Sequence, residues 1–229
     1  MEALDIDTPN GPGRLLIDAP DAPRAAVLLG HGAGGGADAF DLVALAERLP
    51  GRGIAVGRYE QPWRVAGRKV AGPPRTLDRG WLPAAEAFGE RFAGLPWFAG
   101  GRSAGARVAC RCFGPGTAGV VALSFPLFPP GKDDRTRVAE LAGVRGPVLI
   151  VQGDRDPFGS DAVVRATCAE VEQAGERTVV GVPGAHSFTS RSKAAREAAG
   201  ALAESFADAV GSFVDAVVAP PRDRAAGLA

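Results

Sequence analysis

Short runs of aliphatic residues recur along this chain and alternate with longer, alanine-rich segments whose apolar residues follow helical spacing. No polar residue interrupts the run Val148-Leu149-Ile150-Val151, which is typical of a strand buried on both faces of a parallel sheet. Alternating strands and helices predict an α/β fold, with a mostly parallel central sheet and helices on both faces. The predicted strands are residues 25–29, 54–58, 96–99, 120–124, 148–152 and 178–182. The predicted helices are residues 39–49, 82–92, 104–112, 161–174 and 193–218.

Two segments depart from this alternation. Residues 60–80 are rich in Pro, Gly and Arg and predict a long surface loop, and residues 125–137 are also irregular. A chain of 229 residues with 46% hydrophobic content suits one well-cored domain. We therefore predict a single domain over residues 1–219 without a large cap domain. Residues 220–229 begin with two prolines and continue with charged and small residues, which predicts a disordered C-terminal tail.

Charge and composition exclude several classes of partner. The 26 basic and 26 acidic residues balance, so no overall field attracts nucleic acid or an anionic membrane. The acidic first residues lack the pattern of a secretory signal, and no segment is apolar enough to span a bilayer. We expect a soluble cytoplasmic protein, while the oligomeric state stays open. Three cysteines and two histidines fit neither a disulfide framework nor a zinc site, so no metal or cofactor is expected.

A G-x-S-x-G motif centred on Ser103 lies between a predicted strand and a predicted helix. This context is typical of a nucleophile elbow, in which a sharp turn lifts the serine hydroxyl out of the sheet. Glycines two positions before and after let the strand and helix approach each other closely. Because 32 residues are glycine, the motif alone is only moderately specific, and a glycine-rich turn with an N-cap serine is the alternative.

Candidate partners for Ser103 follow two later strands, in the order acid and then histidine. His186 is the only histidine after the motif, and an imidazole there can take the serine proton and pass it to the leaving group. Asp154 and Asp156 both follow the preceding strand. We choose Asp156 as the acid, because the carboxylate directly after a strand more often binds turn amides. The predicted catalytic residues are Ser103, Asp156 and His186.

A glycine-rich loop follows the first predicted strand, with the sequence G-H-G-A-G at residues 30–34. It lacks the Lys-Ser or Lys-Thr ending of a phosphate-binding loop and the spacing of a dinucleotide-binding loop. The loop matches instead the type that supplies one N–H to an oxyanion hole. We assign such backbone donors to Ala33, to Gly34 and to Ala104, the residue after the serine. His31 is expected to brace the loop rather than exchange protons.

The chain resembles small single-domain α/β hydrolases of the dienelactone-hydrolase type. More narrowly, it is similar to the branch with the hydrolase-like domain of an NSL complex regulatory subunit and a testis-expressed protein. The resemblance implies the α/β-hydrolase fold and a triad of Ser103, Asp156 and His186. It rests on G-H-G-A-G at 30–34, G-G-R-S-A-G-A-R at 100–107, S-F-P-L-F-P-P-G-K at 124–132, G-D-R-D-P-F-G at 153–159 and H-S-F at 186–188.

The sequence identifies the type of reaction more closely than it identifies the substrate. Arg68 and Arg75, with Arg102 beside the serine, suggest an anionic substrate, although we favour the alternative of a solvated basic loop. Trp63 and Phe125 are candidates for the wall of an apolar acyl pocket. We predict a carboxylesterase or thioesterase that forms an acyl-enzyme with a small-molecule acyl substrate. The alternatives are a non-catalytic binding scaffold of the same fold and an acyltransferase with the same triad.

Overall fold

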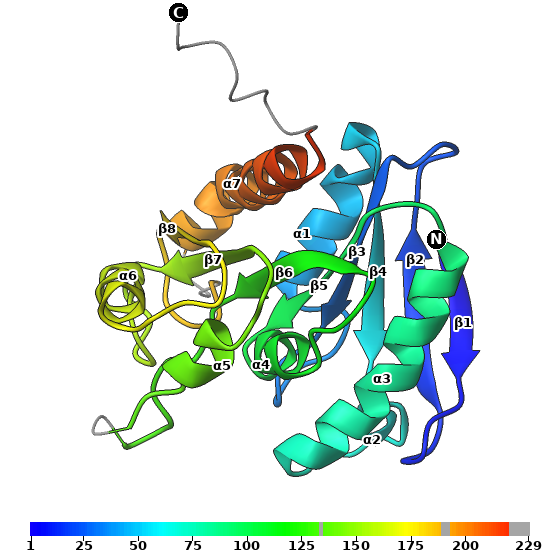
Figure 1. Cartoon of the computed structure of the whole chain (residues 1–229), viewed down its shortest axis with the longest axis horizontal. Helices are drawn as coiled ribbons and strands as arrows, with labels where there is room; N and C mark the ends of the chain where they lie inside the picture. Colours follow the sequence, from blue (N-terminus) through cyan, green and yellow to red (C-terminus); the bar gives the residue numbers. More distant parts are fainter. Residues whose placement is uncertain (133–134, 189–192, 220–229) are drawn as a thin grey trace, which may run out of the picture.

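The computed structural model describes residues 1–132, 135–188 and 193–219 of the chain. In this part, eight strands form one sheet in the order β1-β2-β4-β3-β5-β6-β7-β8 (Figure 1). Strands β3 to β8 run parallel, whereas β2 pairs antiparallel with both β1 and β4. The predicted mostly parallel sheet is therefore confirmed. The strands are β1 Glu2–Ile6, β2 Gly13–Asp18, β3 Ala25–Gly30, β4 Ile54–Glu60, β5 Trp97–Arg102, β6 Thr117–Leu123, β7 Val148–Gly153 and β8 Arg177–Val182.

Helices cover both faces of the sheet, α1 and α7 on one and α3, α4 and α6 on the other (Figure 1). The described residues form no large cap over the carboxyl ends of the strands, and none of their helices is long and apolar enough to cross a membrane. The helices are α1 Phe40–Arg48, α2 Pro62–Val65, α3 Pro74–Arg91, α4 Ala104–Arg111, α5 Val138–Ala142, α6 Asp161–Glu170 and α7 Lys193–Val218, with a 3-10 turn at Pro50–Arg52.

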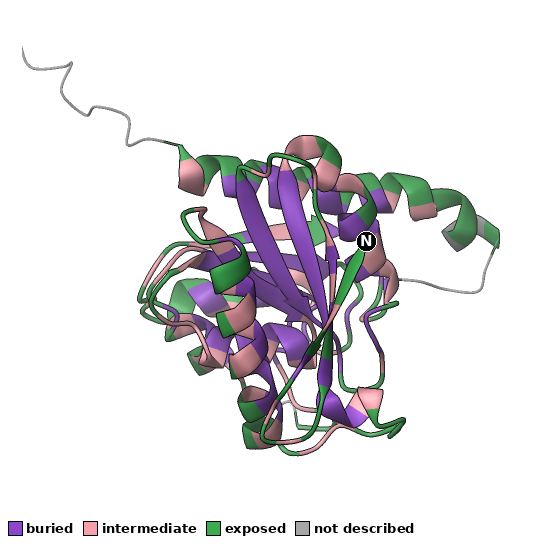
Figure 2. Cartoon of the chain, turned by 90° about the vertical axis from the view of Figure 1, so that its right-hand side faces the viewer, coloured by how far each residue is buried: buried purple, intermediate pink, exposed green. Residues whose placement is uncertain are grey.

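The sheet separates two hydrophobic layers. Leu45 of α1 and Phe206 of α7 pack in one layer, and Trp81 and Phe88 of α3 pack in the other. Every residue of β3 and β7 is buried, and Figure 2 shows the central strands in the colour of buried residues. The aliphatic side chains of these strands therefore pack into both hydrophobic layers, alternately on one face of the sheet and on the other.

The predicted surface loop over residues 60–80 is wrong in two places: α2 spans Pro62–Val65 with Pro62 and Trp63 buried, and α3 begins at Pro74 rather than at residue 82. Proline suits the first turn of a helix, because its missing N–H has no intrahelical acceptor there. Leu77 and Trp81 then face the core with Ala84 and Phe88 at helical spacing. No predicted element corresponds to β1, β2 or α5, whereas α7 has the predicted bounds. The predicted tail, residues 220–229, lies outside the described residues.

Candidate active site

The backbone at Ser103 makes a sharp turn between β5 and α4. Ser103 has φ 54° and ψ −108°, a conformation that costs energy for any residue with a side chain. A Cβ atom on Gly101 or Gly105 would collide with the backbone of Gly30. The Ser103 N–H donates to the carbonyl of Leu123 at 2.9 Å, which fixes the turn against β6. The two glycines of the motif are therefore required by the close packing of β3 against this turn.

The structure brings the side chains of Ser103, His186 and Asp156 into one hydrogen-bonded row. His186 Nε2 lies 2.9 Å from Ser103 Oγ, and His186 Nδ1 lies 2.8 Å from Asp156 Oδ2. The carboxylate is completely buried, while the imidazole is 21% exposed. A carboxylate only accepts hydrogen bonds, so Nδ1 carries the ring proton and Nε2 is left to accept from the serine hydroxyl. This is the arrangement that a general base needs.

The two aspartates after β7 have different partners. Asp154 Oδ1 accepts a hydrogen bond from the Gly184 N–H at 2.8 Å, which joins the loops that follow β7 and β8. Asp156 Oδ1 accepts from the Phe158 N–H at 2.9 Å, so only its second oxygen faces the histidine. Asp154 therefore binds a turn amide, as expected from its position, and Asp156 is the carboxylate that contacts His186.

Gln152 supports the acid and was not found by sequence reasoning. Its side chain is completely buried at the end of β7. Its Nε2 donates to Asp156 Oδ2 at 3.0 Å and lies within hydrogen-bond distance of the carbonyls of Phe125 and Gly159. A long polar side chain that directly follows an aliphatic run is the signal that could have indicated this role, because buried polar groups need partners.

Backbone N–H groups without acceptors occur in the glycine-rich loop and directly after the serine. In the described part of the chain, the N–H groups of Ala33, Gly34 and Ala104 donate no hydrogen bond. A Cβ atom on Gly32 would lie 3.5 Å from Ser103 Cβ, so the glycine-rich loop packs directly against the serine. Ala104 begins α4, where the free N–H groups and the helix dipole favour negative charge. These donors can stabilise an oxyanion that forms next to Ser103.

His31 is buried behind the glycine-rich loop and has both ring nitrogens engaged. Its Nδ1 donates to the Gly32 carbonyl at 2.8 Å, and its Nε2 accepts from the Gln61 N–H at 3.1 Å. Burial lowers the pKa of this imidazole, although the Gly32 carbonyl acts in the opposite direction. A neutral His31 therefore ties the loop to the end of β4.

Arg102, beside the serine, is held by protein groups. Its Nε lies 3.3 Å from Asp41 Oδ2, and its Nη2 donates to the carbonyl of His186 at 2.8 Å. The side chain thus connects α1, β5 and the loop that carries the histidine. Arg68 and Arg75 are exposed, and among the described residues no hydrogen bond or ion pair connects them to Ser103, His186 or Asp156.

Asp41 is an acidic residue that is buried inside the protein. Its side chain is 1% exposed, and burial raises its pKa from 3.8 to about 6, although the nearby Arg102 guanidinium lowers it. The folded protein therefore holds the Asp41 proton more tightly than the unfolded chain does. The stability that this difference supplies is present below about pH 4 and is lost as the pH rises through about 6.

We expect Asp41→Asn to stabilise the protein relative to wild type by an amount that grows with pH. A pKa difference of about two units corresponds to about 3 kcal/mol, from which the cost of an unpaired Arg102 must be subtracted. Denaturant unfolding of both proteins at about pH 4 and at about pH 7 measures the change. An equal difference in unfolding free energy at both pH values would contradict the assignment.

The two aromatic candidates lie in different surroundings. Trp63 is 7% exposed and borders a small cavity together with Ala33 and Ala104. Phe125 is completely buried in the core and does not border that cavity. The turn at Ser124, which has a φ of 45°, is followed by this inward-facing phenyl ring. Trp63 is thus close to the predicted oxyanion donors, whereas Phe125 is a core residue.

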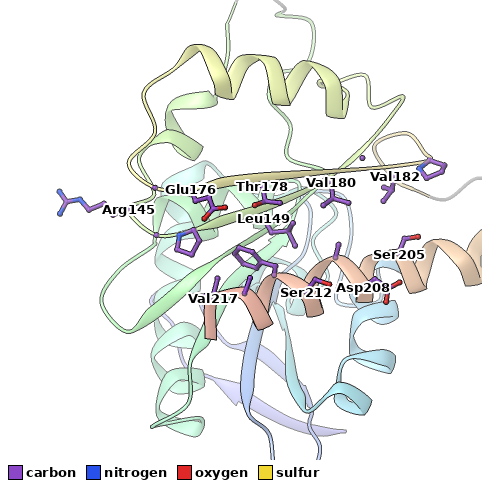
Figure 3. A pocket seen from close by; sticks show the side chains of 18 residues that line it. Arg145, Leu149, Glu176, Thr178, Val180, Val182, Ser205, Asp208, Ser212 and Val217 are labelled. Atoms are coloured by element: carbon purple, nitrogen blue, oxygen red, sulfur yellow. The ribbon is translucent and has the colours of Figure 1, made fainter. Parts of the chain in front are cut away.

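A separate groove of about 920 Å³ lies between β8 and α7 (Figure 3). Leu149 and Val180 of the sheet and Phe213 of α7 line it, with Arg145, Glu176 and Asp208 among its polar residues. None of the three residues in the hydrogen-bonded row lines this groove. The described residues also contain no cluster of His, Cys, Asp or Glu that could hold a metal ion. The groove between β8 and α7 is therefore separate from the hydrogen-bonded row at Ser103.

Comparisons with known proteins agree with this architecture. The family described as alpha/beta hydrolase domain matches residues 23–215. An alpha-beta serine hydrolase homologue from Coxiella burnetii has a TM-score of 0.72 at 18% identity and covers 90% of this chain and 96% of its own. A lidless serine hydrolase from Xanthomonas campestris has a TM-score of 0.70 at 19% identity, covering 96% of both chains. Est1E from Butyrivibrio proteoclasticus has a TM-score of 0.64 at 19% identity, covering 92% and 99%. No curated protein sequence matches the chain.

Proposed function

Because the chain belongs to the alpha/beta hydrolase domain family, we propose that it is a serine esterase that cleaves small acyl esters, thioesters included, through a covalent acyl-enzyme. The observation that carries the proposal is the row of hydrogen bonds from Ser103 through His186 to Asp156. The N–H groups of Ala33 and Ala104 support it, because they have no acceptor among the described residues and Ala104 directly follows Ser103, so they are available to an oxyanion. The motifs at residues 30–34, 100–107 and 153–159 further support a place in the dienelactone-hydrolase-like branch.

In the proposed first step, Ser103 Oγ attacks the acyl carbon while His186 Nε2 takes the hydroxyl proton. The carbonyl oxygen becomes an oxyanion and accepts hydrogen bonds from the backbone of Ala33 and Ala104, with Gly34 as a further donor. Asp156 stabilises the positive imidazolium that forms. When the tetrahedral intermediate collapses, the bond to the leaving alcohol or thiol breaks, and His186 returns the proton to it.

The second step repeats these events with water. Water attacks the acyl-enzyme carbonyl and gives its proton to His186 Nε2. The bond from Ser103 Oγ to the acyl carbon then breaks, and the serine recovers its proton from the imidazolium. A carboxylic acid leaves, and the protein returns to the state seen in the structure. Besides the residues of the chain, the two steps use only the ester and one water molecule.

A small fluorophosphonate probe tests the proposal, because it labels a serine only when a general base and an oxyanion hole activate it. We expect stoichiometric labelling of the wild-type protein and none of Ser103→Ala. Ser205→Ala is the matched control, since Ser205 is an exposed serine on α7, and should be labelled like wild type. An unlabelled wild-type protein would support a non-catalytic scaffold instead, and labelling of Ser103→Ala would show that another serine reacts.

A further inference from the structure

The side chain of Arg102 lies between the segments that carry the nucleophile, the base and the glycine-rich loop. Arg102 is the last residue of β5 and directly precedes Ser103. Its Nη2 donates to the backbone carbonyl of His186 at 2.8 Å, and its Nη1 would lie 3.4 Å from a Cβ atom on Gly32. The guanidinium therefore contacts the loop of the histidine and the glycine-rich loop, while its own backbone leads directly into the serine.

The bond from Arg102 to His186 closes a short ring around the nucleophile and the base. One side of this ring is the hydrogen bond between Ser103 Oγ and His186 Nε2, at 2.9 Å. The other side runs from the backbone of Ser103 through the adjacent Arg102 side chain to the His186 carbonyl. Because both sides join the same two residues, the Arg102 bond limits how far the imidazole can move away from the hydroxyl. A misplacement of about 1 Å can cost an enzyme about 100-fold in rate.

Two other contacts hold the histidine loop from different directions. The Gly184 N–H is bonded to the loop that follows β7. The ring of Phe188 packs edge-on against Phe206 of α7, with the centroids 4.8 Å apart. Of these three contacts, only the one from Arg102 reaches the strand that leads into Ser103. The separation of base and nucleophile therefore depends on this arginine more than on the rest of the loop packing.

Asp41, at the start of α1, holds the guanidinium through its charge. Asp41 Oδ2 lies 3.3 Å from Arg102 Nε, an ion-pair distance without the alignment of a hydrogen bond. Because the carboxylate is almost completely buried, little water screens this attraction. Burial raises the pKa of Asp41, whereas Arg102 and His186 both lower it, so the carboxylate lies within electrostatic range of both positive groups. It thereby offsets the repulsion between the guanidinium and the imidazolium that forms during catalysis.

We propose that Arg102 is a positioning residue, which keeps His186 at the distance from Ser103 that proton transfer needs, and that Asp41 anchors it. The proposal rests on the function proposed above. It differs from the anionic-substrate role that the sequence suggested for Arg102, because protein groups surround the guanidinium on several sides. The side chain is only 14% exposed, so little of it faces a substrate.

Arg102→Met tests the proposal, because it removes the donor but keeps an unbranched side chain. We expect kcat for an aryl ester at about pH 8, where Asp41 is ionised, to fall by about 100-fold. KM should change by less than about threefold, since the arginine acts on the base and not on the bound ester. Arg102→Lys keeps one charged donor and should recover at least about tenfold in kcat relative to Arg102→Met.

Arg107→Met is the matched control. Arg107 is similarly buried, at 20% exposed, and pairs with Glu140 at 2.7 Å. Its loss removes an arginine and an ion pair but no contact to His186. We expect a kcat within about threefold of wild type, because a partly exposed ion pair contributes mainly modest stability. An equal loss in Arg107→Met and Arg102→Met would contradict the positioning role.

The His186→Ala background separates positioning from other roles of Arg102. In that background, Arg102→Met should lower the residual rate by less than about threefold, because the imidazole through which it acts is absent. An equal loss in both backgrounds would show that Arg102 acts on the substrate or on the fold, and would overturn the proposal. A raised KM with unchanged kcat in Arg102→Met alone would overturn it as well.

Asp41→Asn tests the anchor and serves as the second variant if Arg102→Met does not fold. We expect it to lower kcat at about pH 8, by less than Arg102→Met does, although it raises the free energy of unfolding at this pH. Loss of structure cannot produce a slower protein that is also more stable. An unchanged kcat in Asp41→Asn would overturn the role of the ion pair.

The outcomes separate this inference from the proposed function. If the fluorophosphonate labels Ser103 but Arg102→Met keeps the kcat of wild type, the positioning role is wrong and the serine esterase remains. If Ser103 is not labelled and no ester is cleaved, the proposed function is wrong and the positioning role is overturned with it.

Discussion

Replacing His186 by alanine is expected to lower kcat for ester hydrolysis by about 10⁶-fold. The imidazole is the group that takes the proton of Ser103, at 2.9 Å, and returns it to the leaving group. His31, the other histidine of the chain, cannot take over this role, since both of its ring nitrogens already have backbone partners. Steady-state kinetics with an acetyl aryl ester measures the loss, and KM should change little.

Phe158→Leu is the control for this substitution. The Phe158 ring packs edge-on against His186, with centroids 4.7 Å apart, so the variant disturbs the packing of the imidazole but keeps the base. We expect it to lose less than about tenfold in kcat. A similarly small loss in His186→Ala would show that another group acts as the base.

Asp156→Asn is expected to lower kcat by about 10⁴-fold, with little change in KM. Asparagine has nearly the same shape, but its amide cannot stabilise an imidazolium. An amide N–H that faces Nδ1 would also favour the ring tautomer with the proton on Nε2, which cannot accept from the Ser103 hydroxyl. The side chain is fully buried, so water cannot reach this position to stabilise the imidazolium in place of the carboxylate.

Asp154→Asn provides the matched comparison, two residues away in the same loop. Its amide oxygen can still accept from the Gly184 N–H that Asp154 binds at 2.8 Å. We expect a kcat within about tenfold of wild type. Equal losses in the two variants would mean that the loop as a whole, rather than the charge on Asp156, supports activity. Thermal unfolding of both variants excludes a general loss of structure as the cause.

The parallel part of the sheet and the grouping around Ser103 could be predicted because their signals are local. Strand β7 is a buried aliphatic run and β8 a shorter apolar one. The acid and the histidine follow these two strands, so the common direction of parallel strands brings them to one edge. Even the choice of Asp156 over Asp154 followed from the distance of each from the strand end. These features need no knowledge of how distant segments pack.

What could not be predicted depends on contacts between distant segments. Strand β1 is mostly exposed and so has almost no hydrophobic signal, while α3 begins within a Pro- and Gly-rich stretch that resembles a loop. Asp41 lies in α1 and Arg102 at the end of β5, with β4, α2 and α3 between them in the sequence, and only the fold pairs them. Trp63 of α2 and Leu77 of α3 line one small cavity, which only the packing of these helices creates.

The absence of a large cap over the strand ends has a kinetic consequence. Hydrolases whose site is covered by a mobile lid must open it before each turnover, and that motion can limit the rate. Here no such gate stands in the described chain between solvent and His186, whose imidazole is already 21% exposed. A substrate can therefore approach His186 without a lid motion of the described residues.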